Sequence, residues 1–389
     1  MYIFNEEQKL LRSAVRNVVK KMIEPGAEMR DREQIYPSGL IEDLKKLGYY
    51  SLTIPEIWSG AGLDTVSAMI IINEIARADA SIAQSVAAHN FAFLYPLVSM
   101  ATEKQIETFV MPCINGGKIG ALAVNEADGT SGALATTAFE DGEYYIINGS
   151  KKMITNLGAS DYALVYAQTA PNAAGLLGNS VFLVDLHKTP GIVLTKAEDK
   201  MGLHGLSLDG MILDHARVHK SCLIGEKDQG FIFIGKTLEL MSISNAAVAL
   251  GIAERAYIEA VNYTKERKVN GSPMCELESV KLELAEIKMK LTWLKLLVFQ
   301  TAYLQDIQDQ NIGNYFLVTK YTVTETAKEI CDRALQLFGG YGYMKGFIIE
   351  RLYRDIRAYT IIGCSSEVHR SYISQGIFTA TESVNALWE

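Results

Sequence analysis

The period of apolar and polar positions changes twice along the chain. In the first region apolar residues recur every three or four positions from Leu10 through Val15 to Val19, which predicts an amphipathic helix. Asn5 precedes this run and suits the cap of its first turn. Similar patterns predict further helices over 40–47, 67–77 and 81–97. The first region, 1–118, is therefore expected to be a helical domain.

Between 119 and 227 the pattern becomes that of strands. Short runs rich in β-branched and aromatic residues occupy 144–147, 162–167 and 181–185. The first run leads into Asn148-Gly149, a pair typical of a tight hairpin turn. These features predict a small central β domain.

From 228 to 389 the helical period returns. One apolar stripe with spacings of three and four follows a single long helix, as a bundle core or a subunit contact requires: Leu277, Val280, Leu284, Ile287, Leu291, Leu294 and Val298. The order of the three regions predicts an α+β fold that ends in a helical bundle.

Composition excludes several classes of protein. The chain has 389 residues, 49% of them apolar and 21% charged, which indicates a globular protein. A net charge of −8 argues against a nucleic-acid partner. We see no apolar run of about twenty residues and expect no membrane span. The start lacks the pattern of a signal peptide, and the 5 cysteines are scattered, so we expect reduced thiols and a cytoplasmic location. No metal-ligand cluster stands out.

Three motifs carry the most specific chemistry. The strongest is Gln336-Leu-Phe-Gly339-Gly340-Tyr-Gly, followed by Arg354-Asp355, because glycines let backbone approach a ligand closely. The second is Lys152-Met153-Ile154-Thr155-Asn156, and the third runs from Gly120 to Gly132. In this order, over essentially the whole chain, they resemble the signatures of the acyl-CoA dehydrogenase family. The resemblance implies an N-terminal helical domain, a central β-barrel-like domain and a C-terminal four-helix bundle.

The same resemblance implies FAD as cofactor. Val124 and Asn125 match residues at the flavin pyrimidine edge, Ile154 and Thr155 match those near the flavin N5, and Thr130 or Ser131 matches a serine near the pyrophosphate. In the family a neighbouring subunit completes the site, which implies a homodimer or homotetramer. The matching positions here are Arg267, Gln336, Gly339, Gly340, Ser365 and Glu367. The planar donor fork of an arginine suits phosphate oxygens.

The family's catalytic base is missing. The glutamate that removes the substrate α-proton stands in the family at one of two positions, which are Gly363 and Met241 here. Three residues remain as candidates for proton transfer: Cys364, His89 and Glu239. Matches to the family's substrate site give Gln84, Ser85, His89, Glu239 and Ser242. Losing a positioned base typically slows a reaction by roughly 10²–10⁴-fold.

The resemblance therefore predicts an atypical FAD-dependent oxidoreductase that acts on an acyl thioester held on CoA or on an acyl-carrier protein. Three alternatives stay open: non-oxidative elimination such as desulfination, oxidation of an α-hydroxy or α-amino acyl thioester, and an inactive flavin-binding scaffold. The family hands electrons to an electron-transferring flavoprotein, so such a partner is an expectation. Met153 stands where the family has a tryptophan near the electron-exit route, which argues against ordinary handover.

Overall fold

The computed structural model describes residues 4–115, 117–127, 134–170, 177–196, 199–310 and 312–379. The chain forms two compact units. The bundle unit comprises Met1–Val19, Thr65–Ala80 and Ser242–Glu389, and the sheet unit comprises Lys20–Asp64 and Ser81–Met241. The domain limits at 118 and 227 stay a prediction.

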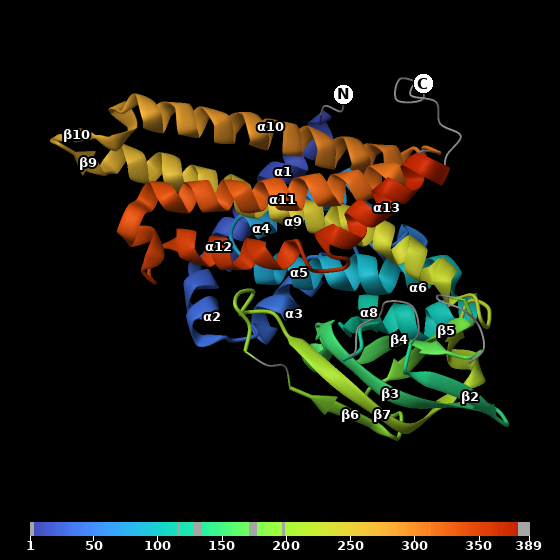
Figure 1. The fold of residues 1–389 in the computed structure, drawn as a ribbon. Coiled ribbons are helices and arrows are strands. Elements are labelled where there is room, and N and C mark those ends of the chain that lie inside the picture. The colour runs from blue at the N-terminus through green and yellow to red at the C-terminus, as the bar shows by residue number, and fades with distance from the viewer. Residues whose placement is uncertain are drawn as a thin grey trace. The chain divides into compact units, whose positions relative to one another are not determined.

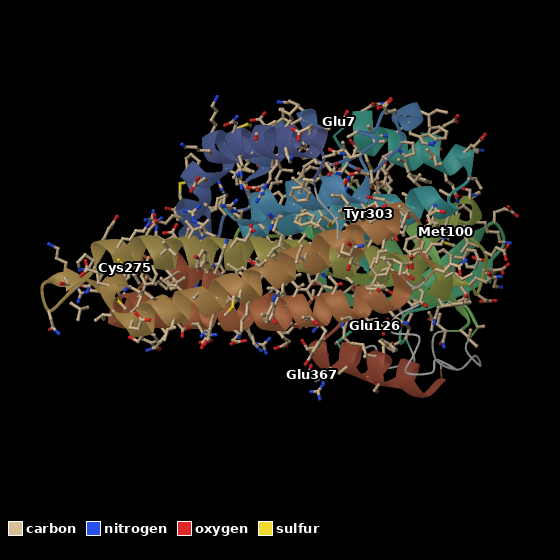
Figure 2. The ribbon with its side chains drawn as sticks, turned by 90° about the horizontal axis from the view of Figure 1, so that it is seen from above. Glu7, Met100, Glu126, Cys275, Tyr303 and Glu367 are labelled. Carbon is tan, nitrogen blue, oxygen red and sulfur yellow. The ribbon has the colours of Figure 1, made fainter. Side chains whose placement is uncertain are left out.

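The bundle unit consists of long helices, and Figure 1 shows α9, α10 and α11 side by side. Its helices are α1 (Glu6–Val18), α4 (Thr65–Ala76), the larger part of α9 (Gly230–Glu266) from Ser242 onward, α10 (Glu278–Asp306), α11 (Ile312–Phe338), α12 (Ile348–Tyr359) and α13 (Ser366–Thr379). A short hairpin of β9 (Lys268–Val269) and β10 (Ser272–Pro273) connects α9 to α10. Figure 2 shows Cys275 at this end of the unit.

The helical pattern of the sequence is confirmed in this unit. Asn5 caps α1 through a capping box: its side chain accepts from the Gln8 backbone N–H, and the Gln8 side chain accepts from the Asn5 backbone N–H. Along α10 the predicted stripe is buried at Val280, Ile287, Leu291, Leu294 and Val298 and partly exposed at Leu284, whereas Leu277 precedes the helix and is exposed. Apolar burial on one face therefore sets the position of this helix in the bundle.

The sheet unit contains one mixed sheet with the path β6-β7-β3-β2-β4-β5-β8, in which β1 also pairs with β4. Its strands are β1 (Gly120–Ala123), β2 (Thr137–Asp141), β3 (Tyr144–Thr155), β4 (Tyr162–Gln168), β5 (Asn179–Asp185), β6 (Ile192–Thr195), β7 (Leu208–His219) and β8 (Leu223–Ile224). Alternate residues of β4 and β5 enter two separate apolar clusters. Both faces of these central strands are covered, which explains their continuous apolar runs.

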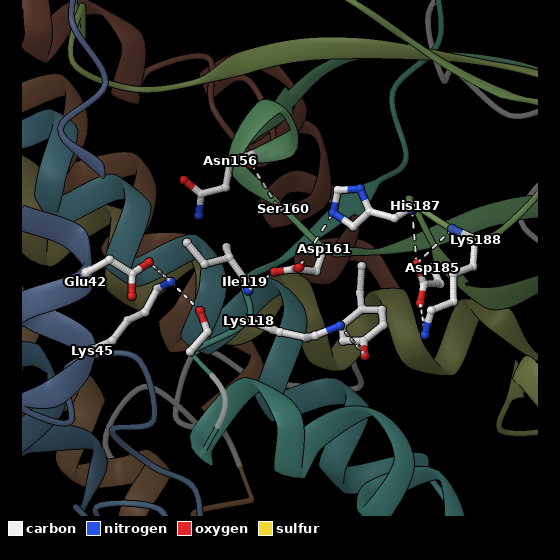
Figure 3. A network of polar contacts seen from close by, with 12 residues as sticks. Glu42, Lys45, Lys118, Ile119, Asn156, Ser160, Asp161, Asp185, His187 and Lys188 are labelled. Atoms are coloured by element: carbon white, nitrogen blue, oxygen red, sulfur yellow. Dashed lines mark hydrogen bonds and ion pairs between the residues drawn. The ribbon is translucent and has the colours of Figure 1, made fainter. Parts of the chain in front are cut away.

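The sheet unit also contains helices, and apolar residues of those between 88 and 115 join residues of β4 and β5 in one cluster. The helices are α2 (Ala27–Glu33), α3 (Ser38–Lys46), α5 (Ala80–Ala87), the π-helix η4 (Ala88–Leu94), α6 (Tyr95–Met100), α7 (Glu103–Gln105), the π-helix η5 (Ile106–Val110) and α8 (Met111–Asn115). The predicted helix over 81–97 is thus continuous but contains a π-helical segment. In Figure 3, Asp161 holds the start of β1 beside β4, since its carboxylate accepts from the Ile119 N–H at 3.0 Å.

The predicted turn at Asn148-Gly149 is wrong. β3 continues through this pair to Thr155, and its register with β7 shifts between Ile147 and Gly149, which is a β-bulge. The Asn148 side chain accepts from the His215 N–H at 2.8 Å. A Cβ on Gly149 would lie 2.4 Å from the Thr136 hydroxyl, so the bulge requires glycine.

Among the described residues, α9 alone is long and apolar enough to cross a membrane by length and composition, with a window of mean hydropathy 1.3. By length and composition alone α9 could span a membrane, so the expectation of no membrane span stays a prediction. However, 61% of this window is buried inside the structure, as in the core helix of a globular protein. The described residues contain no group of three or more histidine, cysteine or acidic residues that could hold a metal ion.

Candidate functional site

A buried ion pair anchors the loop that follows β1. Lys151 lies on the inward face of β3 with no exposed side-chain area, and its amine lies 2.7 Å from the Glu126 carboxylate. It also donates to the Val124 carbonyl at 3.0 Å. Glu126 in turn accepts from the backbone N–H of Ala135 and Thr136. These bonds fix the backbone of 124–126 against the sheet.

The electrostatics of this pair are set by burial. Desolvation lowers the pKa of Lys151 to about 8, although the Glu126 carboxylate opposes the shift. Burial acts to raise the pKa of Glu126, but hydrogen bonds from Lys151, Thr136 and Ala135 outweigh it and hold that pKa below its usual value. The pair is therefore charged at neutral pH.

The residues matched to the flavin edge lie at this loop and at the end of β3. The Lys152 N–H donates to the Asn125 carbonyl at 2.9 Å, which joins the two segments. Val124 and Thr155 are partly exposed, Asn125 is exposed and Ile154 is buried. The structure thus brings these four predicted residues onto one part of the sheet unit. Thr130 and Ser131 lie outside the described residues.

Met153 protrudes next to them. It lies in a second register shift between β3 and β7, with a left-handed φ of 53°, and 67% of its surface is exposed. A bulge in this place turns the side chain out of the sheet. Simple core filling, the ordinary role of a methionine, does not apply here.

The bundle unit contains a pocket of about 450 Å³ where α9 and α11 end. Its lining residues are Tyr263, Arg267, Met274, Gln336, Leu337, Phe338, Gly339, Gly340, Tyr341 and Met344. Four of the predicted cofactor residues, Arg267, Gln336, Gly339 and Gly340, are thus brought together. Ser365 and Glu367 are not among its lining residues and lie at the start of α13, where the Ser365 hydroxyl accepts from the Val368 N–H.

This pocket fits the phosphate and aromatic parts of a dinucleotide. The Arg267 guanidinium lies 5.5 Å from the centre of the Tyr341 ring, and Tyr263 stacks on Phe338 at 4.1 Å. A Cβ on Gly340 would meet nothing within 4 Å of the chain, so packing within the chain does not require this glycine. Gly339 is equally open, but its left-handed φ of 57° favours glycine on backbone grounds. A cation, flat apolar walls and an open glycine surface suit a dinucleotide such as FAD.

In the bundle unit, the position at which the family has its catalytic base lies in a turn. Gly363 follows α12 with a left-handed φ of 80°. Its neighbour Cys364 is half-buried, and burial raises the pKa of the Cys364 thiol although Lys320 opposes the shift. The amine of Lys320, itself 1% exposed, donates to the Cys364 carbonyl. No carboxylate occurs at 360–366, and the turn presents a protonated thiol at neutral pH.

The other predicted base position, Met241, lies in α9 and is half-buried. Glu239 is exposed on the same helix, although partial burial still raises the pKa of its carboxyl. Gln84, Ser85 and His89 follow one another along α5 and η4 and are buried at 2%, 1% and 0% exposure. Ser242 is buried and begins the bundle-unit part of α9. These assignments stay predictions.

Sequence reasoning missed several buried polar residues at these places. Lys151 and Glu126 were unremarked, as were Lys320 and Tyr50, whose hydroxyl lies 2.8 Å from that of Ser85. The half-buried Tyr36 was also missed. Lys151 offered a signal, because strict alternation along β3 places it on the inward face with Ile147. No comparable pattern marks Lys320, whose role depends on a turn more than forty residues away.

Comparison with known proteins agrees with this arrangement. Family models for the N-terminal, middle and C-terminal domains of acyl-CoA dehydrogenases match residues 5–117, 121–216 and 228–378. A 3-(aryl)acrylate reductase of Clostridium sporogenes is 37% identical, covering 96% of this chain and 99% of the relative. A subunit of the caffeyl-CoA reductase–Etf complex of Acetobacterium woodii is 34% identical over 95% and 98%.

The fold agrees equally well. The structure of butyryl-CoA dehydrogenase from Megasphaera elsdenii superposes with a TM-score of 0.92 at 30% identity, covering 97% of this chain and 99% of that one. The predicted α+β class and its order of helical, sheet and helical domains are thereby confirmed. The chain therefore belongs to the acyl-CoA dehydrogenase family of FAD-dependent oxidoreductases that act on CH–CH donors.

Proposed function

We propose that this protein reduces the α,β double bond of an unsaturated acyl thioester, held on CoA or on a carrier protein, and oxidises simple saturated acyl-CoAs poorly. The Gly363-Cys364 turn carries the proposal, because the thiol of Cys364 is protonated at neutral pH and directly follows Gly363, the position at which the family has a carboxylate base. Two similar proteins whose names are those of reductases support the reductive direction.

In this proposal different residues bind the cofactor and supply the proton. Arg267 and the Gly339-Gly340 backbone would hold the phosphates of an FAD carried by a neighbouring subunit, as the resemblance implies. Thr155 would donate a hydrogen bond to the ring of the FAD of its own subunit. Bound FAD supplies the hydride chemistry at the β-carbon. Cys364 holds the proton that passes to the α-carbon, and solvent restores it to the sulfur. Because burial raises the pKa of Cys364 above that of an ordinary thiol, the group is protonated at neutral pH and has a proton to donate but no charge with which to abstract one.

Among the candidates for proton transfer, Cys364 fits best. Burial lowers the pKa of His89 to about 3, so its imidazole is neutral and a very weak base. Glu239 is exposed on α9. An electron-transferring flavoprotein is the proposed electron donor, supported by the name of the Acetobacterium relative. Assembly into a homodimer or homotetramer and a cytoplasmic location belong to the same proposal.

Anaerobic mixing of the photoreduced holoprotein with thioesters tests this function. We expect unsaturated acyl-CoAs or acyl-carrier thioesters to reoxidise the flavin, whereas butyryl-CoA reduces the oxidised protein slowly. Cys364→Ala should slow reoxidation roughly 10²–10⁴-fold. Cys222→Ala is the matched control, since Cys222 is also a half-buried thiol whose pKa is raised by burial.

The outcomes separate the alternatives. A flavin that responds to no thioester would favour the inactive scaffold, and release of a leaving group without change in the flavin would favour elimination. Rapid flavin reduction by α-hydroxy or α-amino acyl thioesters would favour that oxidation instead. Equal reoxidation by Cys364→Ala and the parent would show that another group supplies the proton.

A further inference from the structure

The buried amine of Lys320 lies at the turn that contains Cys364. Lys320 belongs to α11 and is 1% exposed, and its amine donates to the Cys364 carbonyl. The turn follows α12 and leads into α13, and Figure 1 shows both helices beside α11. A charge is costly to bury without an ion-pair partner, and a hydrogen bond to a carbonyl does not require a charge. The position of this lysine therefore indicates a role for its charge.

The carboxylates around this amine have other partners or lie in solvent. Glu325 on α11 accepts from the Ser366 hydroxyl at 2.6 Å and forms an ion pair with Lys328 at 2.5 Å. Glu367, labelled in Figure 2, is exposed in the first turn of α13. Both carboxylates act on the pKa of Lys320, but neither forms an ion pair with it among the described residues. The charge of Lys320 is therefore not neutralised by direct contact with a carboxylate.

The thiol of Cys364 is the group on which this charge acts. Burial raises the pKa of the Cys364 thiol, and the Lys320 charge opposes that effect. His369 on α13 is 2% exposed, its Nδ1–H donates to the Ser365 carbonyl at 3.0 Å, and burial lowers its pKa, so this imidazole is neutral at neutral pH. Arg357 on α12 acts on the acidic side chains of α11 and α13. Lys320 is thus the cation that faces the thiol.

A cation is useful at this thiol because proton donation creates a negative charge. Reduction of the double bond places hydride from the cofactor on the β-carbon and a proton on the α-carbon. When Cys364 supplies that proton, its S–H bond breaks, the new C–H bond forms and the electron pair stays on sulfur as a thiolate. Burial disfavours a thiolate, whereas a neighbouring cation favours it. Solvent then returns a proton to the sulfur.

The same amine helps to fix the backbone that carries the thiol. No helix or strand includes 360–365, so the turn depends on single hydrogen bonds. The Ser366 N–H donates to the Thr360 carbonyl at 3.0 Å, and the Lys320 amine donates to the carbonyl of Cys364 itself. The bond from Lys320 therefore restrains the residue that bears the sulfur.

We propose that Lys320 is a positioning residue for proton transfer by Cys364: it holds the turn through the Cys364 carbonyl, and its positive charge offsets that of the thiolate formed in the reaction. The inference rests on the proposed function and adds to it the group on which the proton donor depends. The hydrogen bond and the charge can be separated by substitution, which makes the two parts of the proposal testable.

Two variants of the holoprotein separate these parts. Lys320→Gln retains an N–H donor without the charge, and Lys320→Met has neither. The photoreduced flavin is reoxidised anaerobically with crotonyl-CoA or cinnamoyl-CoA, whichever reacts faster with the parent. We expect both variants to slow reoxidation about 10- to 100-fold near neutral pH. The parent rate should fall as the pH rises through about 8, where Lys320 loses its proton, and neither variant should show this step.

Lys290→Met is the matched control. It removes an amine of α10 that pairs with Glu329 on α11 in the same unit, so the rate and its pH profile should stay those of the parent. Parent-like reoxidation by Lys320→Gln, with the step near pH 8 still present, would overturn the role of the charge and leave only the hydrogen bond.

A second measurement needs no thioester. Alkylation of Cys364 by iodoacetamide, followed on its peptide by mass spectrometry, reports the thiolate fraction. Near pH 7 we expect both variants to react about 10-fold more slowly than the parent, because the thiolate has lost its cation. The difference should narrow above pH 8, where Lys320 is itself neutral. Equal alkylation in the parent and both variants would overturn the proposal. Equal reoxidation by Cys364→Ala and the parent would instead remove the proposed function, with the alkylation difference intact.

Discussion

Lys151 in the sheet unit and Lys320 in the bundle unit are both buried amines that hold a loop, but their charged neighbours differ. Each donates to a backbone carbonyl of a loop, Lys151 to Val124 and Lys320 to Cys364. Lys151 has a buried carboxylate partner, Glu126, at 2.7 Å. No carboxylate among the described residues forms an ion pair with Lys320, although Glu325 and Glu367 act on its pKa from farther away.

The comparison shows that burial of a cation does not by itself determine how much stability the protein loses when the cation is removed. Desolvation lowers the pKa of both amines to about 8. Removing Lys151 leaves the Glu126 charge buried and unpaired, whereas removing Lys320 leaves only a carbonyl without its donor. Breaking a buried pair by removing one partner is strongly destabilising, but removal of an unpaired buried cation also removes a desolvation penalty.

The largest effect is expected for Lys151→Met. The variant should lose about 3–5 kcal/mol of unfolding free energy, because Glu126 remains charged in an apolar site. It should also retain FAD less well, since Lys151 fixes the Val124 carbonyl at the flavin-edge loop. Urea denaturation and titration of the apoprotein with FAD measure the two effects.

The double variant Lys151→Met/Glu126→Gln is the control for this prediction. A neutral amide removes the stranded charge, and its single oxygen keeps an acceptor for one of the Ala135 and Thr136 N–H groups, which donate to different oxygens of Glu126. The double variant should regain much of the lost stability. If it is no more stable than the single variant, the charge of Glu126 is not the cause.

A smaller effect is expected from the pH dependence of Lys320→Met. The folded pKa of Lys320, about 8, lies below its unfolded value of 10.5, so the unfolded chain binds more protons between these values. Stability from this site therefore rises with pH across the window. Between about pH 7.5 and 9.5 the parent should gain about 2 kcal/mol relative to the variant, measured by urea denaturation.

Near neutral pH the same variant should differ little from the parent. Loss of the hydrogen bond to Cys364 is offset by removal of the desolvation penalty, so we expect a net change within about 1 kcal/mol. Lys328→Met on the same helix, where the amine pairs with Glu325 near the surface, should follow the pH dependence of the parent. Parallel pH curves for the parent and Lys320→Met would contradict a buried charged amine.

The elements of both units could be predicted from sequence because their residues obey one period. The stripe of α10 and the cap of α1 depend on neighbours within a few positions, and both are observed. The hairpin turn predicted at Asn148-Gly149 is not observed, because this pair is equally suited to a hairpin turn and to a β-bulge. Pairing of β3 with β7 determines which of the two forms, and the sequence around Asn148-Gly149 does not indicate that pairing.

The residues of the candidate sites were likewise predictable from the sequence only in part. Arg267, Gln336, Gly339 and Gly340 belong to a contiguous motif or follow a helix end, and they do line one pocket. The contact of Lys320 with Cys364 could not be foreseen, because it depends on how α11 packs against a turn 44 residues away. A sequence gives residue types at a site more readily than the contacts between distant segments.

The smallest effect concerns the turn that Lys320 holds, and it distinguishes the two vacant base positions. Gly363 has a φ of 80°, where any side chain is strained, so Gly363→Ala should lose about 1 kcal/mol of unfolding free energy. Gly235→Ala in helix α9, where a Cβ meets nothing within 4 Å, should instead gain about 0.5–1 kcal/mol. Because Gly363→Glu carries the same backbone strain, Met241→Glu in α9 should be the better-tolerated way to return a carboxylate. Equal stability of Gly363→Ala and the parent, measured by urea denaturation, would mean that the turn relaxes and that both positions accept a base equally well.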